Sequence, residues 1–172
     1  MAMTPDKLKH WINTWPTFVG QGIEVLEVGD DWTHALVRLN STEANANYLG
    51  TAFGGSLFSM LDPFFVILAL EQLGPDFNVW DKAAEIEFVR PGTSAVTARI
   101  DMPADIVEEM RAATKDGEKL LRWFEVDPTD EAGEVVARAR RQLYVRKKRD
   151  RSLPNVIPPV RYKPLCYKPR WR

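Results

Sequence analysis

The run from Gly54 to Leu73 limits the fold more than any other part of the sequence. Apolar residues recur along it at steps of three and four and occupy nearly every face of the helix that this spacing predicts. Gly54-Gly55 opens the run, and a glycine and a proline follow Leu73. A helix with so little polar surface is stable only when other elements enclose it, so the sequence predicts a buried central helix.

Asp62 is the one carboxylate within this apolar stretch before Glu71, and Pro63 follows it directly. Proline inside a helix removes one N–H donor and clashes with the carbonyl four residues earlier, here that of Ser59, which costs about 3 kcal/mol. We therefore expect a bend beside Asp62. The bend either aims the carboxylate into a cleft or fits the helix around a curved sheet.

Strand-like runs flank the central helix on both sides. A hairpin is predicted over 22–40, and four runs with β-branched or aromatic alternation cover 78–92, 94–103, 118–128 and 133–149, with a helical insert at 104–117. Thr4-Pro5 begins a short N-terminal helix, because a hydroxyl cap followed by proline suits a first helical turn. The order predicts an α+β fold in which one long helix packs against an antiparallel sheet of about six strands.

The length of 172 residues suits one domain, which we place at 1–150. We expect residues 151–172, rich in proline, aromatic and basic residues, to be an extended basic tail. Such a tail suits nucleic acid or a neighbouring subunit. We expect no nucleic-acid partner, because the rest of the chain is acidic and would repel a polyanion.

The composition argues against several classes of protein. Cys166 is the only cysteine and the two histidines, His10 and His34, lack the spacing of a zinc site, so we expect no disulfide, no metal and no metal cofactor. The N-terminus lacks a signal-peptide pattern, and we expect no membrane partner because no apolar run approaches the roughly 20 residues of a membrane span. The sequence therefore predicts a cytoplasmic protein.

Two motifs, GTAFGGSLFSMLDP and VWDKAAEIEFVRPG, resemble those of the hotdog-fold acyl-CoA thioesterases, and the likeness runs from about Gly22 to Arg146. The nearer resemblance is to an uncharacterised branch often labelled tetrameric acyl-CoA thioesterase. The resemblance implies a hotdog fold and hydrolysis of an acyl-CoA, with coenzyme A present only as part of the substrate. It also implies a homo-oligomer, either a dimer or a dimer of dimers.

The resemblance also implies roles for individual residues. Asn47 would position substrate or water, a backbone N–H at Gly54 or Gly55 would hold the thioester oxygen, and Asp62 would be the general base or nucleophile. The histidine that thioesterases of the phenylacetate-pathway type usually carry before the Gly-Gly pair is replaced by a phenylalanine, and the hydroxyl often found near the next strand falls at a tryptophan or an aspartate. The candidate substrate-binding residues are Phe53, Ser56, Trp80, Asp81, Arg138 and Arg140. The two arginines suit the phosphates of coenzyme A, and as an alternative they are solvated charges at a sheet edge.

The spacing of the site has a consequence for assembly. Asp62 lies seven residues beyond Gly55, or roughly 10 Å along a continuous helix. One carbonyl cannot touch both, so a working site requires two chains whose central helices run antiparallel about a two-fold axis.

Other readings of the site residues stay open. Asp62 can instead pair within a dimer interface, Gly54-Gly55 can serve close packing, and Asn47 can cap the helix. The leading hypothesis is an acyl-CoA thioesterase. The alternatives are a non-catalytic acyl-CoA or fatty-acyl binding protein and a structural dimerisation module. A dehydratase is less favoured because no histidine lies near the central helix in the sequence.

Overall fold

The computed structural model describes residues 3–148 of the chain, so Cys166 and the predicted tail lie outside the described residues. The helices are α1 Pro5–Ile12, α2 Pro16–Gln21, α3 Gly54–Ser59, α4 Phe64–Leu73 and α5 Ala104–Ala113. The strands are β1 Ile23–Val28, β2 His34–Leu39, β3 Phe77–Phe88, β4 Val96–Asp101, β5 Lys119–Val126, β6 Thr129–Asp130 and β7 Ala137–Lys147. The predicted order is confirmed, with α2 and the two-residue β6 as additions.

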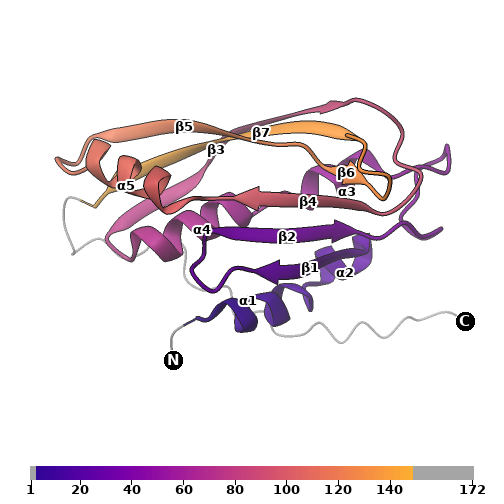
Figure 1. Ribbon diagram of the computed structural model, residues 1–172, viewed down its shortest axis with the longest axis horizontal. Helices are drawn as coiled ribbons and strands as arrows, with labels where there is room; N and C mark the ends of the chain where they lie inside the picture. Colours follow the sequence, from indigo (N-terminus) through magenta and orange to yellow (C-terminus); the bar gives the residue numbers. More distant parts are fainter. Residues whose placement is uncertain (1–2, 149–172) are drawn as a thin grey trace, which may run out of the picture.

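The strands form two antiparallel groups in the orders β1-β2-β4-β6 and β3-β7-β5. Figure 1 shows them side by side along the long axis of the molecule, with β5, β7 and β3 at the top and β1 at the bottom. The segment of α3 and α4 lies against this curved set of strands. The predicted α+β architecture, a long central helical segment packed against antiparallel sheet, is confirmed.

The central helix is interrupted where the sequence predicts a bend. Residues 60–63 form a turn between α3 and α4, and the peptide bond between Asp62 and Pro63 is cis. Backbone hydrogen bonds still link Met60 to Ser56, Leu61 to Phe58 and Asp62 to Ser59, so the interruption comes after Asp62 and the separation of roughly 10 Å between Gly55 and Asp62 stays a prediction. The largest buried side chains of α4 belong to Phe64, Phe65 and Leu68, which lie in the core.

The run 54–73 also corrects the expectation that no segment is long enough to span a membrane. It has the length and hydropathy of a membrane span, but half of the run is buried inside the fold. Its apolar character is accounted for by the strands and helices packed against it.

The outer edge of β1 is closed by the N-terminal helices. Leu8 and Ile12 of α1 are buried, and the Asn13 side chain donates to the Val25 carbonyl at 3.0 Å and accepts from the Val25 N–H at 2.7 Å. Lys9 Nζ donates to the Leu26 carbonyl at 2.5 Å. These bonds occupy backbone groups of β1 that would otherwise be open to another strand.

The twelve-residue strand β3 lies at the opposite edge, and β7 is its only strand neighbour within residues 3–148. Asp81 pairs with Leu143, and a bulge between Asp81 and Ala83 then shifts the register, so that Ala84 pairs with Arg141. Because Leu143 and Arg141 are both buried, Asp81 faces the helical side of the sheet. Asp81 continues the alternation of Phe77 and Val79 on this inner face, and the bulge returns Ala84 to the same face.

Candidate functional site

The site lies at the break in the central helix. Asp62, the last residue before Pro63, keeps 58% of its side chain exposed, and its Oδ1 lies 3.7 Å from Nη1 of Arg141. The same Nη1 donates a hydrogen bond to Asp81 Oδ2 at 2.7 Å. One guanidinium from β7 thus faces two carboxylates, one from the helix break and one from the edge strand.

Arg141 reaches this position because of the two-residue period of β7. The strand alternates between buried and exposed residues, and Arg141 falls on the buried side with Ala139 and Leu143. Its side chain is only 5% exposed. Arg141 Nη2 donates to the Phe58 carbonyl at 3.2 Å, and the guanidinium carbon lies 4.9 Å from the centre of the Phe58 ring, so the arginine also binds the last turn of α3.

Asp81 is the carboxylate of the site whose ionisation is perturbed. Burial raises the pKa of the Asp81 carboxyl above its ordinary value, the nearby Arg141 opposes this rise, and the negative charge of Asp62 adds to it. Asp81 Oδ1 and Arg141 Nε are buried and have no hydrogen-bond partner among the described residues. The guanidinium is therefore shared between the two carboxylates and does not form a bidentate ion pair with either.

The Gly54-Gly55 pair opens α3, and its two backbone N–H groups have no acceptor within residues 3–148. The Phe88 ring lies over Gly54, where an added Cβ would come within 2.8 Å of it, and the Phe53 ring lies against Gly55, where the same distance would be 2.5 Å. Both rings are more than half exposed. The absence of side chains at the two glycines lets these rings pack closely, so two backbone donors without an acceptor among the described residues lie beside exposed aromatic surface.

The structure gives Asn47 a place in its own loop. Its Nδ2 donates to Thr51 Oγ1 at 2.9 Å and to the Ala52 carbonyl at 3.4 Å. Its Oδ1 accepts from the N–H groups of Leu49 and Thr51 at 2.9 and 3.2 Å. These four bonds use the whole capacity of the amide, so Asn47 shapes the loop before α3. Ser56, in the first turn of α3, is buried at 2% exposure.

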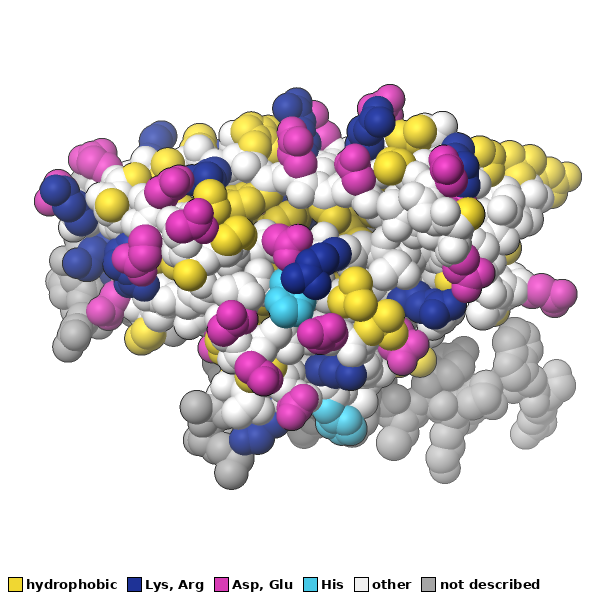
Figure 2. All heavy atoms as spheres, in the orientation of Figure 1, with side chains coloured by type: hydrophobic (Ala, Val, Ile, Leu, Met, Phe, Trp, Pro, Cys, Tyr) yellow, Lys and Arg dark blue, Asp and Glu magenta, His cyan; other side chains and the backbone are white. Residues whose placement is uncertain are grey.

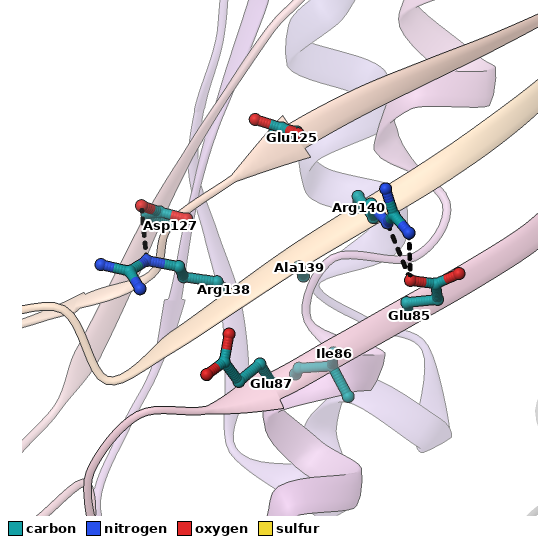
Figure 3. A pocket seen from close by; sticks show the side chains of 8 residues that line it. All are labelled: Glu85, Ile86, Glu87, Glu125, Asp127, Arg138, Ala139 and Arg140. Carbon is teal, nitrogen blue, oxygen red and sulfur yellow. Dashed lines mark hydrogen bonds and ion pairs between the residues drawn. The ribbon is translucent and has the colours of Figure 1, made fainter.

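Three predicted substrate-binding residues lie on the outer face of the sheet, away from Asp62. Trp80 stacks on Tyr144 with ring centres 3.9 Å apart. Arg140 pairs with Glu85 at 2.7 Å and Arg138 lies 3.7 Å from Asp127. Both arginines border a hollow of about 470 Å³ (Figure 3), and Figure 2 shows acidic side chains interspersed with basic ones along the top of the molecule.

The hollow does not suit the phosphates of coenzyme A. Figure 3 shows Glu87 and Glu125 beside it in addition to the two paired acids, so four carboxylates surround two guanidinium groups. Excess negative charge repels phosphate. The role predicted for Arg138 and Arg140 stays a prediction, and these contacts do not support it.

The sequence-based site therefore comes together only in part. The structure joins Asp62 with Asp81 and places Phe53 beside Gly55. Arg141 was missed, although an arginine on the apolar face of a predicted strand signals a buried anionic partner. Among residues 3–148 no group of three or more histidine, cysteine, aspartate or glutamate side chains is arranged to hold a metal ion.

Comparison with known protein families identifies the family to which the chain belongs. Residues 8–145 match the model of a domain of unknown function, DUF4442. The chain belongs to the DUF4442 family. No curated protein matches it.

Solved structures with the same fold carry thioesterase descriptions. One is PA5026 from Pseudomonas aeruginosa, described as a protein of unknown function and probable thioesterase, with a TM-score of 0.72 and 22% identity over 83% of this chain and 96% of that one. Another is the thioesterase HI1161 from Haemophilus influenzae, with a TM-score of 0.63 and 15% identity over 89% of this chain and 97% of that one.

The E. coli PaaI protein from the phenylacetic acid degradation operon, whose description names no reaction, also matches the fold, with a TM-score of 0.52 and 19% identity over 80% of this chain and 93% of that one. At these identities the likeness shows the fold alone, and it confirms the predicted hotdog fold. The narrower resemblance to a tetrameric acyl-CoA thioesterase branch is not confirmed.

Proposed function

We propose that this DUF4442 protein is a thioesterase that hydrolyses an acyl-CoA at a site shared by two subunits. The observation that carries the proposal is the exposed carboxylate of Asp62, held at a break in an otherwise apolar helical segment by a buried arginine. An exposed carboxylate can take a proton from water. The thioesterase descriptions of the structural neighbours support this class of reaction.

The reaction requires a base and a group that stabilises the oxyanion. In our proposal the Gly54 and Gly55 N–H groups bind the thioester oxygen, and Asp62 removes a proton from the attacking water. The new C–O bond forms and the C–S bond breaks. The thiolate of coenzyme A leaves with the proton that Asp62 held, and the products are the free acid and coenzyme A.

The edge strand and its surroundings support a two-fold dimer. β3 has strand pairing on one side only among the described residues, and its second half carries exposed residues up to Phe88. Tyr48, Leu49 and Phe53, in the loop before α3, and Val89, which follows β3, are large exposed hydrophobic residues. Pairing of two β3 edges would continue the sheet and cover apolar surface near both site elements. A dimer of such dimers and a cytoplasmic location stay part of the proposal.

Thiol release from a panel of short, long and aromatic acyl-CoAs tests the reaction with the purified full-length chain. We expect Asp62→Asn to lower kcat by about 10²- to 10⁴-fold, whereas Asp116→Asn, which changes an exposed acid in the turn after α5, leaves the rate unchanged. Absence of thiol release by the wild type across the panel refutes the proposal, as does equal activity of the Asp62→Asn variant.

Mixed dimers test the shared site. Asp62→Asn and Gly55→Val subunits, each inactive alone, form one intact site when the site takes Gly55 from one chain and Asp62 from the other. An equal mixture after subunit exchange should recover about a quarter of wild-type activity, because half of the dimers are mixed and each has one working site. No recovery from dimers shown to be mixed rules out the shared site.

One observation favours a second function, binding of an acyl-CoA or fatty-acyl group without hydrolysis. An exposed Phe53 ring stands where related thioesterases carry a histidine, while His34 pairs with Glu27 at 3.1 Å on β1 and β2. This function predicts saturable binding in calorimetry with no thiol released. Heat stability unaffected by any acyl ligand would instead favour the structural dimerisation module.

A further inference from the structure

We propose that Arg141 is the positioning residue of Asp62. From β7 it fixes the Asp62 carboxylate at the helix break, and Asp81 weakens this interaction because it binds the same guanidinium nitrogen. The inference rests on the proposed function for its kinetic part. Arg141 itself is too deeply buried to touch substrate, so it acts through Asp62.

The burial of Arg141 is the first support. The other residues on the inner face of β7 are apolar, namely Ala137, Ala139, Leu143 and Val145. A guanidinium among them requires anionic or carbonyl partners, because an uncompensated buried charge strongly destabilises a fold. Arg141 finds these partners in the Phe58 carbonyl, Asp81 and Asp62.

The second support is that the guanidinium is anchored independently of Asp62. Nη2 is bonded to the Phe58 carbonyl and the planar group lies over the Phe58 ring, so α3 holds one side of it. Asp81, on β3, holds Nη1. A charge fixed by two other elements defines a position for the more exposed Asp62 carboxylate, which the turn of residues 60–63 carries.

The third support is that the pairing with Asp81 is incomplete. Arg141 Nε and Asp81 Oδ1 are both buried without a partner in the described part of the chain. A bidentate pair would have used more of the donors of the guanidinium. Nη1 is instead shared, which leaves part of its charge directed at Asp62.

Charge changes around Asp62 should therefore have opposite effects. Among the described residues, the charged groups that interact with Asp62 are Arg141 from β7 and Asp81 from β3. Removing the positive charge of Arg141 and removing the negative charge of Asp81 should move the acid limb of the kcat/KM profile in opposite directions. A role confined to packing predicts neither change.

The experiment compares Arg141→Gln, Arg141→Lys and Asp81→Asn in the full-length chain, with kcat/KM measured against pH. Arg141→Gln should lower kcat by about 10- to 100-fold with KM within about twofold. It should also move the acid limb of the profile to higher pH, because the positive charge beside the Asp62 carboxylate is removed. Arg141→Lys should restore part of both effects, and Asp81→Asn should move the acid limb down.

Arg122→Gln is the matched control. Arg122 also lies on the inner face, on the neighbouring strand β5, and pairs with Glu109 at 2.6 Å with no contact to Asp62. It should leave the acid limb in place. An Arg141→Gln variant whose acid limb stays with that of the wild type overturns the proposal, even if its kcat falls.

A second readout does not depend on turnover. The NMR chemical shift of the Asp62 carboxyl carbon at neutral pH should change in Arg141→Gln and in Asp81→Asn, and it should stay in place in Arg122→Gln. If the wild type hydrolyses no acyl-CoA, the proposed function fails, while these two changes still support the positioning role. If the wild type is active and neither variant changes the chemical shift, the positioning role fails alone.

Discussion

Replacement of Asn13 by alanine tests whether the N-terminal helices protect the free backbone groups at the β1 edge of the sheet. The Asn13 side chain forms two hydrogen bonds with the backbone of Val25, one through each atom of its amide. Each bond contributes about 1 kcal/mol net, and the partly buried N–H and carbonyl of Val25 then lose their protein partner, which adds about 1 kcal/mol. We expect Asn13→Ala to lower the free energy of unfolding by about 2–3 kcal/mol.

The assay is urea unfolding followed by tryptophan fluorescence and circular dichroism. The protein concentration must be the same for every variant, because dimer formation adds to apparent stability. A loss of this size corresponds to a decrease in Tm of roughly 5–10 °C for a chain of this length.

Two further variants sharpen the test. Thr14→Ala removes an exposed hydroxyl that donates locally to the Trp11 carbonyl at 2.7 Å, and it should change stability by less than about 1 kcal/mol. Asn13→Asp keeps the acceptor for the Val25 N–H but turns a second oxygen toward the Val25 carbonyl, so it should destabilise at least as much as alanine. A loss for Asn13→Ala no larger than that for Thr14→Ala refutes the reasoning.

Two further predictions concern pH and substrate. Hydrogen bonds from the backbone, above all from the Glu134 N–H, together with the Arg90 guanidinium, lower the pKa of Asp130 below 3.8. The ionised form of Asp130 therefore stabilises the fold above that pH, and this contribution is lost as the pH falls through the lowered pKa. Asp130→Asn should thus lower Tm at pH 7, and in melting curves this difference should shrink below about pH 3.8; a difference independent of pH contradicts the assignment. Arg140→Gln should change KM for an acyl-CoA by less than about twofold because Glu85 already pairs with Arg140, and a tenfold rise in steady-state KM would restore the predicted phosphate contact.

The sequence predicts the elements well because their signals are local. Strand alternation, the Thr4-Pro5 helix start and the apolar period of 54–73 each depend on residues near one another in the chain. The bend at Asp62 is equally local, since proline itself disrupts the helix. The short helix α2 was missed, although Pro16 at its first position and Gly22 in a left-handed conformation at its end are standard helix boundaries.

The site is harder to predict because its contacts join distant residues. A bulge in β3 follows Asp81, and without that bulge the pairing of every later residue in the strand, including that of Ala84 with Arg141, would change. The bonds that fully occupy Asn47 depend on the closed loop to Thr51. Periodicity does place Arg141 on the apolar face of its strand, but only the fold identifies the carboxylates that meet it.

The cluster of Arg141, Asp62 and Asp81 at the helix break does not contribute efficiently to the stability of the fold. Replacement of a buried ion pair by apolar residues of similar volume is often neutral or stabilising, whereas Arg141 brings a charge into the core and leaves two polar atoms of the cluster without partners among residues 3–148. Pro63 adds a second unfavourable feature, because it interrupts the helix beside the same carboxylate. Both features act on the position of Asp62, and neither improves the packing of Phe64 or Phe65 behind it. A helix whose sole task was to fill the sheet would gain stability from losing both, so the cluster is better explained by the chemistry of an accessible carboxylate than by the requirements of the core.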